Sequence, residues 1–264
     1  MIYKYCTTDG FDILLKARLR AAQIEDLNDP FEMVFGVDEG SACDNIKKEY
    51  ESNKNIINDW QKLLDDQKIK YDKNSIEDVL KKVTQFQIKD LKNNIQSIRE
   101  NWNEKIGIVC LSKSPNIIQM WTHYADYHRG IVIALDENQF VKDRKELVKV
   151  CCRDKMVLLP VTTTPEKLEQ YVKYIEHVLR RKESNWRYEK EVRLFVNLHE
   201  EDKDGYYYFD IPQSSITEIY LGLMSPETTE IIAKSIKQRK EYNHLRIYKM
   251  DRHESAFKLV PKEL

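Results

Sequence analysis

The chain has 264 residues, of which 41% are hydrophobic and 33% charged, so it has enough apolar residues to bury a core beneath a well-solvated surface. Its 43 Lys and Arg residues are balanced by 44 Asp and Glu residues, and the formal net charge of -1 argues against a broad duplex-binding surface, which needs a basic excess. The odd number of cysteines, five, argues against a disulfide framework. No run of about 18 apolar residues occurs, which argues against a membrane span. The start, MIYKYCTTDG, is polar and argues against secretion. We therefore expect a cytoplasmic protein with no membrane contact.

The first elements are short. Residues 2–6 (IYKYC) alternate in polarity and predict a strand, and the apolar spacing of residues 11–19 predicts a helix. The Asp29-Pro30 pair predicts a turn, because the residue before a proline avoids the helical region.

Residues 41–106 contain neither glycine nor proline, although the chain has seven of each. Apolar residues recur here at intervals of three and four, the spacing of one helix face. We interpret residues 44–105 as a helical insertion that serves as a structural buttress, a lid or an arm that binds a protein partner.

The remaining sequence is rich in strands. Apolar or alternating runs predict strands at 107–111, 130–135, 188–196, 206–211, 216–221 and 245–250. Helices are expected at 116–125, 165–183 and 225–239. Strands that cluster without strict alternation with helices favour an α+β fold. We expect one domain over residues 1–264, built on a mixed or split sheet.

Three charged residues share one face of the predicted strand at 188–196, because alternate residues of a strand point the same way. They are Glu189, Glu191 and Arg193. This pattern suits a site that binds a hydroxyl group or stabilises a developing cation, and equally an exposed edge strand with an ion pair. Trp121 and Tyr124 have the spacing of a helix face and are more typical of a core. His123 and His128 are five residues apart, a spacing that does not support a metal site.

Four motifs occur in the order YKYC, LNDPFE, MWTHYADYHRG and W-x-x-E-x-E-x-R, which ends at Arg193. Together they resemble a widespread bacterial family of unknown function that is often met among accessory and phage-defence genes. The resemblance covers roughly residues 2–35 and 106–250 and omits the predicted insertion.

The chain also resembles the ADP-ribosyltransferase fold, especially its DNA-modifying toxins. Those enzymes place a His or Arg on the first strand, where this chain has Lys4 and Tyr5. Ser112 and Ser114 resemble the hydroxyl residue after a second strand, and Glu189-Lys190-Glu191 resembles the E-x-E of arginine-directed members.

This second resemblance implies that NAD is a substrate and that Glu191 stabilises the ribosyl cation. Glu189 would then lie next to the acceptor, a nucleic acid or a protein, and Arg193 would hold the two carboxylates in place. The residues expected to bind NAD are Lys4 or Arg18 at the pyrophosphate, Trp121 or Tyr124 as a stacking ring, and Tyr5, Asn28, Ser112 and Ser114 along the same cleft.

Two other functions fit the sequence. One is a ribonuclease-type toxin in which His123 or His128 is the general base and Lys4 or Arg193 binds phosphate. The other is a non-catalytic sensor or partner-binding module that uses the insertion as its interface.

Overall fold

The structure is a computed structural model that describes residues 1–140, 146–163 and 168–264. The chain is α+β and divides into two compact units. The first contains Met1–Asn28, Glu104–Cys152 and Glu183–Leu264, and the second contains Asp29–Asn103 and Arg153–Lys182. Each unit is described by itself below.

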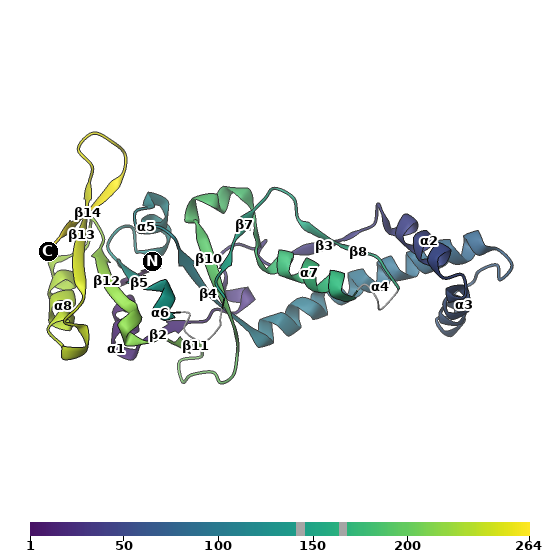
Figure 1. The fold of residues 1–264 in the computed structure, drawn as a ribbon, viewed down its shortest axis with the longest axis horizontal. Helices are drawn as coiled ribbons and strands as arrows, with labels where there is room; N and C mark the ends of the chain where they lie inside the picture. The colour runs from purple at the N-terminus through teal and green to yellow at the C-terminus, as the bar shows by residue number, and fades with distance from the viewer. Residues whose placement is uncertain (141–145, 164–167) are drawn as a thin grey trace. The chain divides into compact units, whose positions relative to one another are not determined.

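The first unit is built on an eight-stranded mixed sheet with the strand order β14-β13-β12-β5-β1-β4-β10-β6 (Figure 1). Only β12 and β13 pair in parallel; the other neighbours in this sheet are antiparallel. Apolar runs of five to seven residues form most of these strands, as the alternating or continuous hydrophobic pattern predicts. The strands are β1 (Ile2–Cys6), β4 (Ile106–Ser112), β5 (Ile131–Leu135), β6 (Val148–Lys149), β10 (Glu191–Asn197), β12 (Ile216–Leu221), β13 (Arg246–Arg252) and β14 (Leu259–Glu263).

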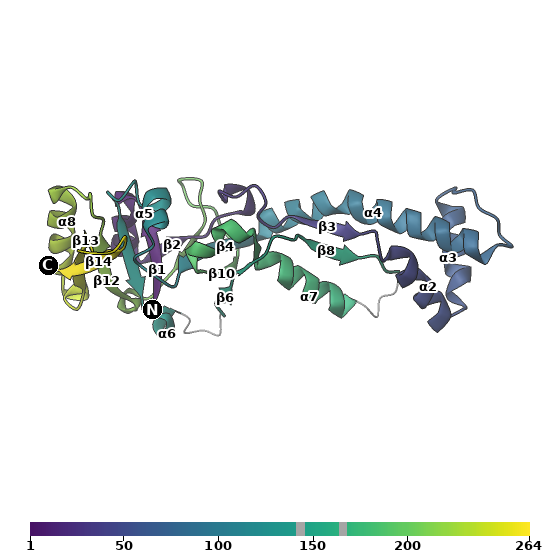
Figure 2. The same cartoon turned by 90° about the horizontal axis from the view of Figure 1, so that it is seen from above.

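Each face of this sheet buries its own cluster of side chains. On one face, Leu14 of α1 (Phe11–Lys16) and Ile236 of α8 (Glu227–Lys237) pack against alternate residues of the central strands, and Phe140 of α6 (Glu137–Phe140) joins the same cluster. On the other face, α5 (Ile118–Tyr124) buries Trp121 against Tyr5, Val132 and Tyr220. Figure 2 shows α5 and α8 beside their strands. The fold therefore fixes the orientation of α5, which carries several of the predicted site residues.

The sheet is barely joined between β1 and β4. In the described chain these strands are paired only at Tyr3 and Ser112, whereas β1 and β5 are paired at five positions. Below this pair, the side-chain amine of Lys4 donates to the carbonyl of Cys110 at 3.1 Å, and Ala22 bridges to Ile108. The strands thus form two groups, β14 to β1 and β4 to β6, that share a single point of pairing.

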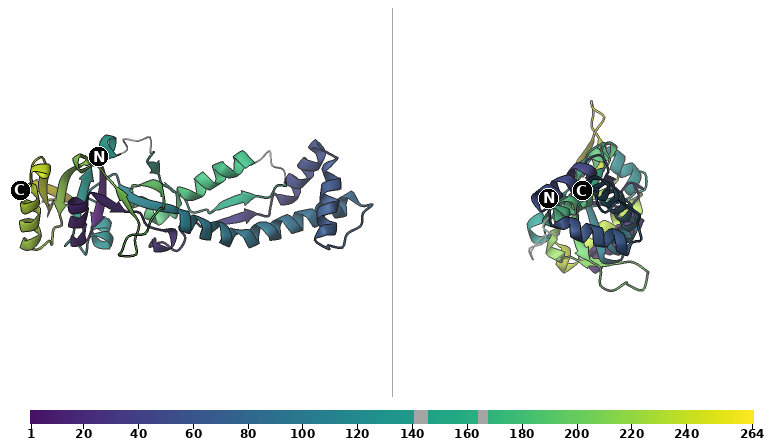
Figure 3. Two further views of the ribbon diagram at one scale, coloured as in Figure 1. Left: turned by 90° about the horizontal axis from the view of Figure 1, so that it is seen from below. Right: turned by 90° about the vertical axis from the view of Figure 1, so that its right-hand side faces the viewer.

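The second unit combines helices with a two-stranded parallel sheet. Trp60 and Leu64 of α3 pack against Ile46 of α2 and Val83 of α4 to form its core. Figure 3 shows helices α2 to α4 in shades of blue. The elements are β3 (Phe35–Asp38), α2 (Ala42–Ser52), α3 (Ile56–Asp66), α4 (Ile76–Lys105), β8 (Val157–Pro160), α7 (Leu168–Leu179) and β9 (Arg181–Lys182). Helices α2 to α4 occupy the range predicted as an insertion, but the unit also takes in the β3–β8 pair and α7. The predicted start of the helix at 165–183 lies outside the described residues.

Two predicted boundaries were wrong because a left-handed residue ends a helical segment. Helix α1 stops at Lys16, since Ala17 has φ 50° and ψ 46°, and residues 18–20 form β2 (Arg18–Arg20) instead of continuing the helix. In the same way Lys190, with φ 49°, delays β10 until Glu191.

The predicted strand at 206–211 is shortened to β11 (Tyr208–Asp210). It pairs with β2 in a separate two-stranded sheet and is not a member of the large sheet. The two-residue strands β7 (Cys151–Cys152) and β9 were not predicted either. Within the described residues, no helix is both long and apolar enough to cross a membrane.

Candidate functional site

A buried ion pair of the first unit lies at the start of β10. Arg193 donates from Nε to Oε1 of Glu191 at 2.7 Å and from Nη2 to Oε2 at 3.0 Å. The side chain of Arg193 has no exposed surface, and that of Glu191 is only 5% exposed. Two residues at i and i+2 share one strand face, which explains how a single strand positions both groups. The buried, two-point geometry excludes the interpretation of an exposed edge-strand pair.

The predicted position of Glu189 on this strand is wrong. Glu189 lies in the 3-10 turn at Ser184–Glu189. The left-handed backbone of Lys190 separates it from β10. Glu189 is nevertheless only 2% exposed. Two carboxylates one residue apart are therefore both buried, although they belong to different elements.

Tyr124, the last residue of α5, connects Glu189 to the N-terminal segment. Its hydroxyl donates to Oε1 of Glu189 at 2.6 Å and accepts from Nδ2 of Asn28 at 2.9 Å. A phenol hydroxyl has one proton and two lone pairs, so it can fill both roles together. The contact brings together three of the predicted site residues, which are separated by 161 positions along the chain from first to last.

Ser112, at the end of β4, ties the turn of Glu189 to the sheet. It lies opposite Glu191 in the β4–β10 register, and its hydroxyl donates to the backbone carbonyl of Glu189 at 2.7 Å. The following loop is held by Tyr5, whose hydroxyl donates to the carbonyl of Ser114 at 2.9 Å and accepts from the N–H of Ile117. Burial raises the pKa of Tyr5, so the phenol stays protonated and keeps this arrangement.

Trp121 packs behind these residues rather than opening onto solvent. Its ring is edge-on to Tyr5, with 5.5 Å between centroids, and its indole N–H donates to the carbonyl of Pro115. The side chain is fully buried. Trp121 can therefore support the site, but in this conformation it does not present a stacking face to a ligand.

Cys110, which is not among the predicted site residues, lies beside the ion pair. Cys110 is opposite Arg193 in the β4–β10 register. Burial and the nearby negative charge of Glu191 raise the pKa of its thiol to about 12. The alternation of β4, in which residues 108, 110 and 112 share a face, could have indicated this position, but the run GIVCL reads simply as a buried strand.

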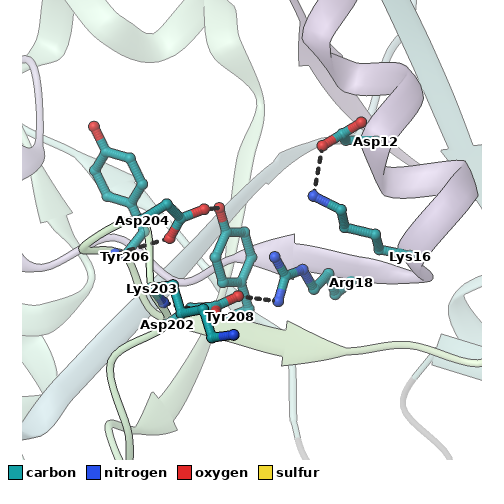
Figure 4. A network of polar contacts seen from close by, with 8 residues as sticks. All are labelled: Asp12, Lys16, Arg18, Asp202, Lys203, Asp204, Tyr206 and Tyr208. Carbon is teal, nitrogen blue, oxygen red and sulfur yellow. Dashed lines mark hydrogen bonds and ion pairs between the residues drawn. The ribbon is translucent and has the colours of Figure 1, made fainter.

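Arg18 is engaged in a different cluster, shown in Figure 4. Its guanidinium forms an ion pair with Asp202 and lies over the ring of Tyr208, with 3.7 Å from Cζ to the centroid. The Tyr208 hydroxyl in turn donates to Asp204 at 2.6 Å. This cluster belongs to the β2–β11 sheet and includes none of the other predicted site residues. Arg18 is thus not brought to the carboxylates.

The two histidines of the 120–130 motif differ in environment. His128 lies with its ring nearly parallel to that of Trp121, and Nε2 is 3.2 Å from the hydroxyl of Thr122. His123 is exposed and in edge contact with Tyr124. In the part of the chain that the structure describes, no three His, Cys, Asp or Glu side chains are arranged to hold a metal ion.

The arrangement is chemically specific. It presents two buried carboxylates, one fixed by a guanidinium and one bonded to a phenol hydroxyl, at the point where the two groups of strands meet. No family model, curated protein or solved structure matches the chain. The resemblances to the bacterial family and to the ADP-ribosyltransferase fold therefore stay predictions.

Proposed function

We propose that the first unit cleaves the bond between nicotinamide and ribose in NAD and transfers ADP-ribose to a nucleic acid, a protein or water. The observation that carries this proposal is the burial of Glu189 and Glu191 together, each held by its own donor. Carboxylates are costly to bury, and such groups concentrate at sites where their charge is used.

The proposed reaction needs a negatively charged group beside the ribose carbon that loses nicotinamide. The nicotinamide nitrogen leaves with the bonding electrons, and positive charge develops on the ribose as in glycoside cleavage. A fixed carboxylate favours that transition state over the neutral sugar of the ground state. The lone pair of the acceptor then forms the new bond to the sugar carbon, and the proton that the acceptor loses passes to a carboxylate.

The geometry suggests how the two glutamates divide this work. Arg193 donates to both oxygens of Glu191 and so fixes this carboxylate in one orientation, as a group that stabilises a developing positive charge requires. Glu191 is therefore assigned to the sugar. Glu189 accepts a hydrogen bond from the hydroxyl of Tyr124, a neutral group. Glu189 is assigned to the acceptor.

The sheet supplies a second line of support. The carboxylates lie beside Ser112, the residue of β4 that pairs with β1, so they are placed where the two groups of strands diverge. A mixed sheet that is divided in this way agrees with the predicted likeness to the ADP-ribosyltransferase fold. The agreement is an analogy of architecture, and the argument for the chemistry rests on the side chains.

The test is NAD consumption and label transfer by the purified full chain, with and without DNA, RNA and protein acceptors. We expect Glu191→Gln to lower the rate by about 100-fold or more, because the charge is lost while the size is kept. Glu189→Gln should impair transfer to an acceptor more than nicotinamide release. Glu263→Gln, an exposed glutamate on β14, is the matched control and should be neutral.

Folding must be followed in the same experiment, because Glu191→Gln also weakens a buried ion pair. Thermal melts identify variants that lose activity only by unfolding. No NAD turnover by the folded wild-type chain with any acceptor would reject the proposal, as would full activity in Glu191→Gln. A ribonuclease would show a third result, in which His123→Ala or His128→Ala abolishes RNA cleavage and NAD has no effect.

A further inference from the structure

A pocket of about 610 Å³ lies in the first unit between α5 and the loop that joins β13 to β14. Its walls include Ile118, His128, Leu223, Arg252, Phe257 and Lys258. We call it the hairpin pocket. Its volume is in the range of small-molecule sites, about 300 to 1,000 Å³. None of the residues assigned above to NAD lines it.

His128 forms part of the pocket wall and is held by a contact with α5. The Thr122 hydroxyl donates to the carbonyl of Ile118 at 3.2 Å and lies 3.2 Å from Nε2 of His128. The other ring nitrogen of His128, Nδ1, is buried and has no hydrogen-bond partner among the described residues.

The backbone that carries His128 is held in an uncommon conformation. Asp126, Tyr127 and His128 have φ values of 43°, 48° and 69°, three left-handed residues in succession without a glycine. Such residues cost free energy and persist where the surroundings impose them, often at functional sites. Gly222 and Met224 fix this segment: the N–H of Met224 donates to the His128 carbonyl, and a Cβ on Gly222 would lie 2.1 Å from that oxygen.

The loop side of the pocket combines positive charge with an uncovered aromatic ring. Arg252 and Lys258 are exposed, and neither makes an ion pair with any residue in the described ranges. With Glu254, also in the wall, they give the loop a formal charge of +1. Phe257 is fully exposed, an unfavourable state for a phenyl ring unless something covers it.

His253 adds a hydrogen-bond donor to the pocket wall. Its Nδ1 accepts from the N–H of Ser255 at 3.2 Å, so in the neutral ring Nε2 carries the proton and can donate. The pocket wall therefore combines two cations, one carboxylate, one imidazole donor and apolar side chains.

We propose that the hairpin pocket binds a small planar aromatic anion, with its ring against Phe257, Leu223 and Ile118 and its acidic group between Arg252 and Lys258. Concavity favours a small molecule over a protein surface, and the unpaired cations favour an anion over a neutral ligand. This site is independent of the proposed NAD chemistry.

The probe is naphthalene-2-sulfonate, titrated into the full chain and followed by calorimetry and by amide chemical shifts. The neutral 2-naphthalenemethanol and the ringless methanesulfonate are the two comparison compounds. The sulfonate should bind at least about tenfold more tightly than either, because ring burial and the ionic contact each contribute. Shifts should centre on residues 252–259 and on His128.

Variants then test each contact. Phe257→Ala should weaken the sulfonate about tenfold, and Arg252→Ala with Lys258→Ala by a similar factor, while the alcohol should be insensitive to the loss of the cations. The controls are Ile231→Ala and Lys237→Ala on α8, which remove an apolar and a cationic side chain that do not line the pocket.

Failure of the sulfonate to bind overturns the proposal, as does equal affinity for the alcohol or an unchanged affinity in Phe257→Ala. Self-association that Phe257→Ala abolishes, without any binding of the sulfonate, would also overturn it and would identify the exposed ring as a protein contact. NAD turnover is not a readout here, so the two proposals stand or fall separately.

Discussion

Glu191 and Arg193, separated by one residue on β10, form a two-point ion pair in which the arginine side chain has no exposed surface and the glutamate side chain only 5%. A charge buried in this way is stable only while its partner remains. The pair therefore joins stability to function: Glu191 is proposed for catalysis, and the loss of either partner would leave a buried charge in the first unit.

Removing one member of the pair should be severe. We expect Arg193→Met to lower the free energy of unfolding by about 3 to 5 kcal/mol, because it leaves a buried carboxylate without this partner. Arg193→Lys should be intermediate, since an ammonium group cannot reproduce the two parallel hydrogen bonds. Urea unfolding measures both changes. Lys16→Met is the matched control, because its pair with Asp12 is largely exposed, and it should have no measurable effect.

Tyr124 provides a test that leaves every charge in place. Tyr124→Phe removes the hydroxyl between Asn28 and Glu189 and leaves a buried carboxylate with one donor fewer. The expected loss is about 1 to 3 kcal/mol in the free energy of unfolding. Tyr127→Phe is the control, since that side chain is 66% exposed. An equal effect in the two variants would show that the hydroxyl contributes nothing to the fixation of Glu189.

Most strands of the large sheet could be predicted from the sequence, because their apolar side chains are the ones that the sheet buries. The strands at residues 2–6 and 216–221 have the predicted bounds, and the alternation of β10 correctly placed Glu191 and Arg193 on one face. These features depend on neighbours in sequence. The pattern of a single strand is sufficient to predict them.

The errors arise where distant contacts or backbone angles decide. Leu19 fits a helical spacing with Leu15, yet Leu15 is 45% exposed and Leu19 is buried in a strand, because β11 pairs with β2. A lysine gives no sequence signal for the left-handed φ of Lys190, so the predicted strand at 188–196 began too early. Tyr124 bonds to Asn28, 96 positions away in the sequence, and to Glu189, 65 positions away, and no local pattern contains these contacts.

The cysteines should differ widely in reactivity. Burial raises the pKa of the Cys6 thiol to about 11, and burial together with Glu191 raises that of Cys110 to about 12. The thiolate is the reactive species, so both should resist iodoacetamide near pH 8 in the folded protein. Exposed Cys43 should be modified first. Mass spectrometry over time gives the order, and early modification of Cys110 would contradict the raised pKa of its thiol.

Gly222 should tolerate no side chain. An added Cβ would lie 2.1 Å from the carbonyl oxygen and 2.6 Å from the carbonyl carbon of His128, both backbone atoms that cannot rotate away. We expect Gly222→Ala to cost about 1 to 3 kcal/mol and to shift the amide resonances of residues 126–130. Gly40→Ala is the control, because its nearest neighbour would be a carboxylate oxygen of Asp38 at 3.7 Å. Equal melting temperatures for the two variants would contradict the close approach.

His128 should make the stability of the first unit depend on pH. Burial lowers its pKa in the folded chain, whereas in the unfolded chain it titrates near the ordinary value of about 6.5. Below that value the unfolded state binds more protons than the folded state, so the contribution is complete above about pH 6.5 and declines as the pH falls toward the folded pKa. The variant His128→Phe keeps a ring beside Trp121 but cannot take up a proton. Its melting temperature should therefore fall less than that of the wild type between about pH 7 and pH 5. Substitution of exposed His123 by Phe serves as the control and should leave the slope unchanged. Parallel curves for wild type and His128→Phe would show that the ring takes up its proton as easily in the folded chain as in the unfolded one.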